Sequence, residues 1–161
     1  MHWAPELFNC SAPDTGNMET LVRYGTDAQK REWLDRLLAG EIRSCFAMTE
    51  PDVASSDARN ICSTILRDGD DYVLNGEKWY VTSANLADFF WFQAVLPEEN
   101  DEALFFVDQG TPGVEMIANP LFSHTYAAHH PTYRFENVRV PAAQRVGAAG
   151  DGMAYTHSWF R

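Results

Sequence analysis

The pattern of apolar and polar positions changes once along the chain, from helical spacing before residue 42 to alternation after it. A first helix is predicted to end at Gly25. A second is predicted to begin at Thr26, because Thr26 and Gln29 have the spacing of a capping box, and to end near Gly40. Both helices are amphipathic, so we expect them to pack against another part of the protein. The apolar stripe of the second helix consists of Trp33, Leu34, Leu37 and Leu38.

From Ile42 onward apolar residues alternate with polar ones, which is the pattern of half-buried β-strands. Asn75-Gly76 lies between two alternating runs and predicts a β-hairpin. Many strands at short spacing without intervening helices indicate an antiparallel barrel or sandwich, so the predicted fold class is α+β. The predicted strands are Arg43–Thr49, Ile61–Arg67, Tyr72–Leu74, Glu77–Ser83, Phe89–Leu96, Ala103–Val107, Val114–Ile117, Tyr133–Phe135 and Gln144–Val146.

The two ends of the chain carry apolar residues that lack local partners. We divide the sequence into helical residues 1–41, a β-domain over residues 42–148 and the start of another helix over residues 149–161. Exposed apolar groups at both ends are expected to pack against flanking domains or a partner chain. These residues are Trp3, Phe8, Met153, Tyr155, Trp159 and Phe160.

The stretch RSCFAMTEPDVASSD, residues 43–57, changes from an alternating strand into a loop rich in small hydroxyl residues. Proline cannot donate to a sheet ladder, so Pro51 should end the strand. The loop combines backbone amides with the hydroxyls of Thr49, Ser55 and Ser56, which suits contact with a polar heterocycle or a phosphate. An ordinary strand-to-loop exit has the same composition and is the alternative interpretation.

The stretch NGEKWYVTS, residues 75–83, places an aromatic ring and a hydroxyl on the same face of a predicted strand. Alternation puts Tyr80 and Thr82 together, opposite Trp79 and Val81. Such a pair could stack on a planar cofactor and donate a hydrogen bond to its edge. Strands favour both residue types, so an ordinary half-exposed face is the alternative.

Charge excludes some classes of partner. The chain has 23 acidic and 12 basic residues and a net charge of −11, which argues against binding to nucleic acid or to an anionic membrane surface. No apolar run approaches the roughly 20 residues of a membrane span, and the N-terminus lacks the pattern of a signal peptide. These features indicate a cytoplasmic protein.

Cysteine and histidine spacing does not indicate a metal site. The 3 cysteines are odd in number, which favours a reducing compartment, and Cys45 and Cys62 lie in apolar stretches typical of core residues. His124, His129 and His130 lack a carboxylate or cysteine at ligand spacing, so we interpret them as part of a polar loop.

The order of the motifs resembles the acyl-CoA dehydrogenase family, specifically its middle β-domain. A strand ends in F-x-M-T-E-P, a small-residue loop ends in S-D, and N-G-x-K-W-Y-x-T follows. The later segments T-P-G-V and R-F-E-N-V-R-V-P are also similar to the family. The opening APELFNCSAPDTGNMETLVRYGT resembles the branch of acyl-CoA dehydrogenase family members 10 and 11. The resemblance implies that helical domains flank this β-domain, and the sequence lacks most of both.

The resemblance also implies that the chain binds FAD. In the family, the first motif bonds the pyrimidine edge of the flavin, and Thr82 matches the threonine that bonds N5, the atom that receives a hydride. Tyr80 matches an aromatic residue packed against the flavin. Ser55 or Ser56 would contact the FAD pyrophosphate or the substrate's pantetheine arm, and His129 could contact a substrate phosphate. The implied cofactor-binding set is Phe46, Ala47, Met48, Thr49, Ser55, Ser56, Tyr80, Val81 and Thr82.

The implied reaction is the α,β-dehydrogenation of an acyl-CoA thioester, as in fatty-acid β-oxidation. A glutamate removes the α-proton, and we expect this base in a C-terminal domain outside the sequence, so no catalytic residue is predicted here. Glu50 belongs to the flavin-side loop and is interpreted as structural. Electron-transfer flavoprotein or a similar acceptor and a second copy of the chain are the other expected partners. The alternative is an inactive middle domain that acts only as a binding module.

Overall fold

The computed structural model describes residues 12–123, 129–148 and 150–159. For residues 158 and 159 it describes the backbone alone. Cys10, His124, Phe160 and the N-terminal aromatic residues therefore lie outside the described part, as does the side chain of Trp159. Within the described ranges, no helix is long and apolar enough to cross a membrane.

Two helical segments precede the sheet. Helix α1 spans Asp14–Tyr24, and a continuous helix follows as α2 (Asp27–Gln29), a π-helical turn (Lys30–Leu34) and α3 (Asp35–Leu38). The predicted capping box is confirmed, because Gln29 N donates to Thr26 Oγ1 at 3.2 Å and Thr26 N donates to Gln29 Oε1 at 3.0 Å. The predicted apolar stripe is buried except at Leu38, which is 64% exposed because it points away from the sheet.

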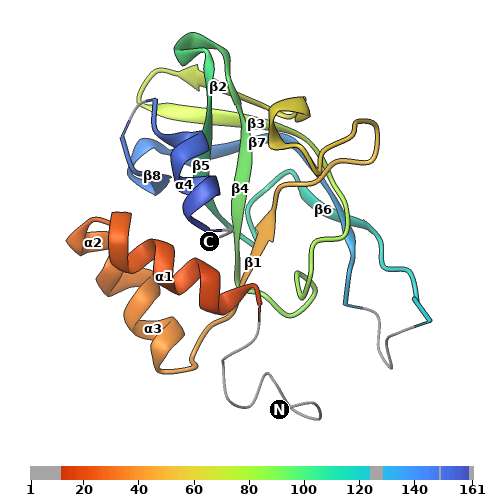
Figure 1. Ribbon diagram of the computed structural model, residues 1–161, viewed down its shortest axis with the longest axis horizontal. Coiled ribbons are helices and arrows are strands. Elements are labelled where there is room, and N and C mark those ends of the chain that lie inside the picture. Colours follow the sequence, from red (N-terminus) through yellow and green to blue (C-terminus); the bar gives the residue numbers. More distant parts are fainter. Residues whose placement is uncertain (1–11, 124–128, 149, 160–161) are drawn as a thin grey trace.

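Eight strands form one sheet in the order β6-β7-β3-β2-β4-β5-β8, with β1 paired to β4 (Figure 1). The β1–β4 pair is parallel, and β2 meets β4 in parallel at Thr64 and Val95, whereas the other pairs are antiparallel. The α+β class is confirmed, with a mixed sheet. The strands are β1 (Ser44–Ala47), β2 (Thr64–Asp68), β3 (Asp71–Lys78), β4 (Phe89–Leu96), β5 (Asp101–Asp108), β6 (Val114–Ala118), β7 (Thr132–Pro141) and β8 (Arg145–Val146).

Alternation along β4 supplies two hydrophobic cores, one on each face of the strand. Phe90 and Phe92 are buried within the sheet cluster. Phe89 and Trp91 face the helices, where the Trp33 ring packs 4.5 Å from that of Phe106 on β5. Helix α4 (Gly152–Trp159) lies over β5 on the same side as α1 (Figure 1). The helices thus cover one face of β4 and β5, and the remaining strands curl around the other.

The predicted hairpin at Asn75-Gly76 is wrong. Strand β3 continues through both residues, and the turn lies earlier, at Gly69-Asp70 between β2 and β3. Gly76 has φ 153°, and its pairing with β7 shifts register there. A side chain on Gly76 would collide with Ser63. Glycine serves here for close approach of a neighbouring segment, which local turn chemistry does not distinguish from a hairpin.

The predicted strand Glu77–Ser83 is also wrong beyond Lys78. The alternation stops because Tyr80 and Ser83 have left-handed backbone conformations, with φ 50° and 62°. This segment instead forms a turn whose backbone bonds to distant loops.

Two predicted burial states are corrected by the structure. Cys62 is exposed rather than part of the core, because it precedes β2 in the loop. Tyr155 is buried rather than uncovered. Its ring packs against Tyr24 of α1, with centroids 4.4 Å apart, and its hydroxyl donates to Asp151 Oδ2 at 2.9 Å. Ala148 N donates to the same hydroxyl at 3.2 Å, so Tyr155 ties α4 to α1 and to the loop after β8.

Candidate functional site

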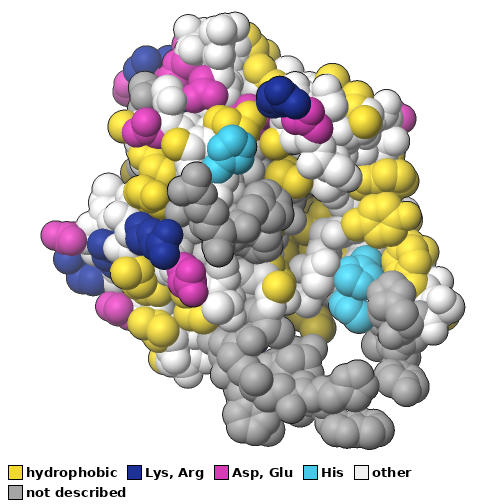
Figure 2. Space-filling view, in the orientation of Figure 1, with side chains coloured by type: hydrophobic (Ala, Val, Ile, Leu, Met, Phe, Trp, Pro, Cys, Tyr) yellow, Lys and Arg dark blue, Asp and Glu magenta, His cyan; other side chains and the backbone are white. Residues whose placement is uncertain are grey.

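A surface groove of about 180 Å³ brings together the two stretches that the sequence singles out. Five of the nine predicted cofactor-binding residues line it. Hydrophobic side chains and histidines gather beside one another on this face of the molecule (Figure 2). The groove, as we use the word below, is lined by Ala12, Pro13, Phe46, Met48, Thr49, Tyr80 and Thr82.

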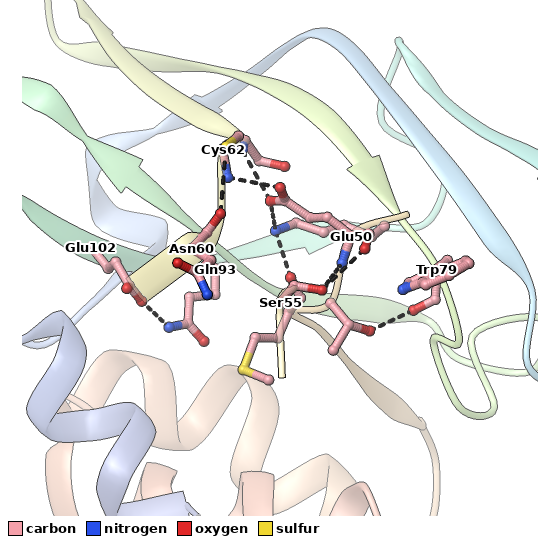
Figure 3. Close-up of polar contacts among 11 residues, drawn as sticks. Glu50, Ser55, Asn60, Cys62, Trp79, Gln93 and Glu102 are labelled. Atoms are coloured by element: carbon pink, nitrogen blue, oxygen red, sulfur yellow. Dashed lines mark hydrogen bonds and ion pairs between the residues drawn. The ribbon is translucent and has the colours of Figure 1, made fainter. Parts of the chain in front are cut away.

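Two hydrogen bonds tie the exit of β1 to the turn after β3. Trp79 N donates to Thr49 O at 3.0 Å, and Thr49 Oγ1 donates to Trp79 O at 2.8 Å. The second bond is visible in the close-up (Figure 3). Because both partners are fixed through backbone atoms, Tyr80 is held next to the strand exit without strand pairing at this point.

Tyr80 and Thr82 form one side of the groove. The Tyr80 side chain is 50% exposed, and its ring lies 4.6 Å from that of Trp79 and 5.5 Å from that of Phe122. Thr82 Oγ1 lies 3.1 Å from His130 Nδ1. The groove therefore combines an aromatic ring and two hydroxyls with the apolar side chains of Phe46 and Met48, which fits the flat, polar-edged ring system of a flavin.

A buried lysine lies behind the groove. Lys78 is fully buried, and its Nζ donates to Met48 O at 2.9 Å and to Glu50 Oε1 at 2.8 Å. Burial lowers the pKa of the Lys78 amine to about 8, against the attraction of Glu50. The C=O and the following N–H of a trans peptide point in opposite directions, so this bond directs the Thr49 N–H away from Lys78. Lys78 thus orients the backbone that the sequence assigns to flavin binding.

The Glu50 carboxylate is fully engaged in structural contacts. Besides Lys78, it accepts from Cys62 N at 2.7 Å and from Ser63 N at 3.0 Å, which joins the β1 exit to the start of β2 (Figure 3). Burial raises the pKa of Glu50, but the adjacent Lys78 ammonium and the hydrogen bonds from Lys78, Ser63 and Cys62 together hold that pKa below its ordinary value. These contacts support the structural interpretation of Glu50.

The other predicted site residues do not line the groove. Ser55 is buried, and its Oγ accepts from Glu50 N at 2.7 Å and donates to Glu50 O at 3.0 Å. Ser56 is exposed on the same loop. Ala47 and Val81 are buried in the sheet cluster behind the groove. The His129 ring stacks beside that of His130, with centroids 4.1 Å apart.

A second buried carboxylate lies at the start of β5. Glu102 accepts a short hydrogen bond from Gln93 Nε2 on β4 (Figure 3). Burial raises the pKa of Glu102 because no cation touches its carboxylate within the described part of the chain.

Lys78 and His130 make polar contacts at this site to which the sequence interpretation assigns no role, and Ala12 and Pro13 line the groove without having been predicted to. A signal for Lys78 is present, because Tyr72, Leu74 and Lys78 all fall on the inward face of one alternating run. A lysine at an inward position needs a buried partner, and this requirement could have pointed to Glu50. No comparable local signal exists for His130, whose contact with Thr82 depends on the fold.

Comparisons with known proteins identify the family of the chain. The family model for the acyl-CoA dehydrogenase middle domain matches residues 45–138. The protein named probable acyl-CoA dehydrogenase FadE2 of Mycobacterium tuberculosis is 46% identical over 162 residues, which cover 96% of this chain and 40% of that protein. Acyl-CoA dehydrogenase family member 11 of Gallus gallus is 45% identical, with 93% of this chain and 21% of the relative covered.

Solved structures give the same result. Butyryl-CoA dehydrogenase from Megasphaera elsdenii superposes with a TM-score of 0.86 at 26% identity, covering 94% of this chain and 40% of that one. A glutaryl-CoA dehydrogenase from Mycobacterium smegmatis, solved in complex with FADH2, superposes with a TM-score of 0.76 at 32% identity, covering 89% of this chain and 36% of that one. The chain thus spans less than half the length of these relatives. It belongs to the acyl-CoA dehydrogenase family and contains the middle domain of that family.

Proposed function

We propose that this chain supplies the FAD-binding and acyl-CoA-binding β-domain of an FAD-dependent acyl-CoA dehydrogenase. The observation that carries the proposal is the groove, which is lined by the Tyr80 ring, the hydroxyl residues Thr49 and Thr82 and the apolar side chains of Phe46 and Met48. Family membership and the FADH2 complex of a similar structure support it.

Each groove residue has a proposed role toward FAD. The backbone of residues 46–49 and the Thr49 hydroxyl bind the pyrimidine edge of the flavin, which Lys78 favours by holding Met48 O on the opposite side of the peptide. Tyr80, backed by the buried Val81, packs against the ring system. The Thr82 hydroxyl lies at the N5 edge. When bound, FAD would supply the hydride acceptor for oxidation of the acyl chain.

We assign the substrate contacts to residues beyond the groove. Ser56, exposed on the loop after β1, is available to the pyrophosphate or pantetheine groups, whereas the Ser55 hydroxyl already holds the Glu50 backbone. His129 is assigned to a substrate phosphate. No base is proposed within the chain, because Glu50 is occupied by Lys78 and by two backbone N–H groups. An electron-transfer flavoprotein or similar acceptor, a second copy of the chain and a cytoplasmic location stay predictions.

Titration of the purified chain with FAD tests the proposal. We expect quenching of FAD fluorescence, a structured visible absorbance band and a rise in the unfolding midpoint with FAD concentration, since a ligand that binds only the folded state stabilises it. Thr49→Val and Tyr80→Ala should each weaken binding, because they remove a hydroxyl and a ring from the groove. Leu38→Ala, at an exposed site on the helical side, is the matched control.

Dye-linked oxidation of acyl-CoA tests whether the chain turns over substrate on its own. FAD binding without turnover by the chain is the expected result, because the base is proposed to lie outside it. Turnover would contradict the absence of a base, and failure of FAD to bind at any accessible concentration would refute the assignment of the groove.

A further inference from the structure

The Thr82 hydroxyl is anchored to an imidazole at the edge of the groove. Thr82 Oγ1 lies 3.1 Å from His130 Nδ1. Backbone bonds flank this contact, because Val81 N donates to Pro131 O at 3.1 Å and Ser83 N donates to His129 O at 2.6 Å. The two segments are therefore joined on both sides of Thr82. This pairing fixes the imidazole against a hydroxyl that lines the groove.

Neighbouring rings hold the His130 side chain in place. Its centroid lies 4.1 Å from that of His129 and 5.6 Å from that of Phe122, which meets it at 71°. Phe122 in turn lies 5.5 Å from the Tyr80 ring in the groove. The imidazole thus belongs to a set of packed rings, and its orientation toward Thr82 does not depend on the hydrogen bond alone.

A hydroxyl has one proton to donate and two lone pairs to accept with, and an imidazole nitrogen can act in either way. If His130 Nδ1 lacks a proton, the Thr82 hydroxyl donates to it and offers only lone pairs to a ligand in the groove. If Nδ1 carries a proton, His130 donates to Thr82, and the hydroxyl proton is free to point at the ligand. The state of one ring therefore determines what Thr82 offers.

We propose that His130 is a positioning residue that sets whether the Thr82 hydroxyl donates to FAD or accepts from it. The inference rests on the proposed function, because it places the flavin ring in the groove. Flavin N5 accepts a hydrogen bond when the ring is oxidised and donates one when the ring is reduced. The His130–Thr82 pair therefore biases the relative affinity of the chain for the two redox forms.

The test measures the dissociation constants of oxidised and reduced FAD for the wild-type chain and for variants. His130→Phe keeps an aromatic ring for packing but removes the hydrogen bond, and it should change the ratio of the two constants by about two- to tenfold. Thr82→Val should change the same ratio. The double variant should have the same ratio of dissociation constants as Thr82→Val alone, because the proposed effect of His130 passes through Thr82.

Two controls separate positioning from a general structural effect. His129→Phe alters the ring that stacks on His130 without removing the Thr82 contact, and it should leave the ratio within about twofold of the wild type. His130→Asn can place an amide atom near the position of Nδ1 and should restore much of the wild-type ratio. Equal effects of His129→Phe and His130→Phe, or fully additive effects of His130→Phe and Thr82→Val, would overturn the proposal.

A measurement without FAD separates failure of this inference from failure of the proposed function. The nitrogen-15 chemical shifts of the His130 imidazole should change in Thr82→Val, and unchanged shifts would overturn the inference whatever FAD does. The proposed function would instead be refuted if the His130 shifts differ between the wild type and Thr82→Val but the wild-type chain binds neither form of FAD. The Thr82–His130 pair would stand in that case.

Discussion

Two buried carboxylates a few strands apart show how differently one sheet can accommodate the same chemical group. Glu50 and Glu102 are 5% and 6% exposed, yet the pKa of Glu50 is lowered and that of Glu102 is raised. Glu50 meets an ammonium and two backbone N–H groups, whereas Glu102 meets one amide, whose own Oε1 lacks a hydrogen-bond partner within the described part of the chain. Partners, not depth of burial, decide the sign of the shift.

The two carboxylates also differ in what their contacts do for the structure. The Glu50–Lys78 contact joins separate segments beside the groove, whereas the Glu102–Gln93 contact adds nothing that the sheet does not already hold. Glu50 and Lys78 connect the β1 exit, the start of β2 and the end of β3, and the groove lies directly above them. Glu102 connects neighbouring positions on β4 and β5, which the sheet ladder already holds together. Substitutions at these residues should therefore have effects of different size and sign.

Lys78→Met should have the largest effect. It leaves the Glu50 carboxylate buried without its cation and should lower the free energy of unfolding by about 3–5 kcal/mol. Urea denaturation at neutral pH measures the change. Lys30→Met, in the π-helical turn, is the control and should unfold close to the wild type.

The double variant Glu50→Gln/Lys78→Met sharpens this test. It removes both charges, so it should be more stable than Lys78→Met alone. A double variant that is less stable than the single one would show that the Glu50 carboxylate stabilises the fold through Cys62 N and Ser63 N even without Lys78.

Acid should act on the two carboxylates in opposite directions. The pKa of Glu50 is lower in the folded than in the unfolded state, so its stabilising contribution is present above pH 4.5 and is lost as pH falls through the folded pKa. Glu102 has a raised pKa, so the folded state takes up its proton first and gains stability as pH falls toward 4.5. Glu102→Gln should therefore steepen the acid loss of stability, and Glu50→Gln should flatten it. Unfolding curves between pH 7 and pH 3, roughly the range in which carboxylates titrate, measure both slopes.

Glu102→Gln should stabilise the protein slightly at neutral pH. The substitution keeps an oxygen that can accept from Gln93 and removes a buried charge that no cation offsets, so we expect a gain of about 0.5–1 kcal/mol. Thermal unfolding measures it. A loss of stability would mean that Glu102 has a cationic partner in solution.

Arg139→Ala should have the smallest effect. Its guanidinium is 54% exposed and pairs with Asp68 and Asp71 at the β2–β3 turn, where water and salt screen the attraction. We expect no resolvable change in the unfolding midpoint. A clear loss of stability would show that this exposed ion pair contributes to folding as the buried Glu50–Lys78 pair does.

Local sequence signals predicted the features that depend on local chemistry. The capping box at Thr26 formed because its two partners are three residues apart. The apolar run Phe89–Leu96 was correctly predicted as strand β4, but its burial on both faces differs from the half-buried state that we expected. The hairpin prediction at Asn75-Gly76 failed because the glycine is required by the close approach of Ser63, just before β2, a contact that sequence proximity does not reveal.

The sequence singled out residues that lie close together, but not the way in which the fold brings them together. Thr49, Tyr80 and Thr82, whose flavin contacts stay a prediction, line one groove. Tyr80 and Thr82 reach it through a turn with left-handed residues instead of through strand alternation. The inward position of Lys78 in the alternation of β3 was a local signal for a buried partner, whereas the contact of His130 with Thr82 joins segments distant in sequence and has no local pattern.

The packing of Tyr24 on Tyr155 has a consequence for the order of folding. These rings join α1 to α4, and the loop that their contact closes includes the entire sheet. Closing a long loop costs entropy before any contact repays it, whereas the β2–β3 turn brings together residues that are already close. Hairpins should therefore form early, and the two helices should meet each other only after the strands have assembled. Transition-state analysis would then find native-like contacts in the β2–β3 hairpin and few at the tyrosine pair.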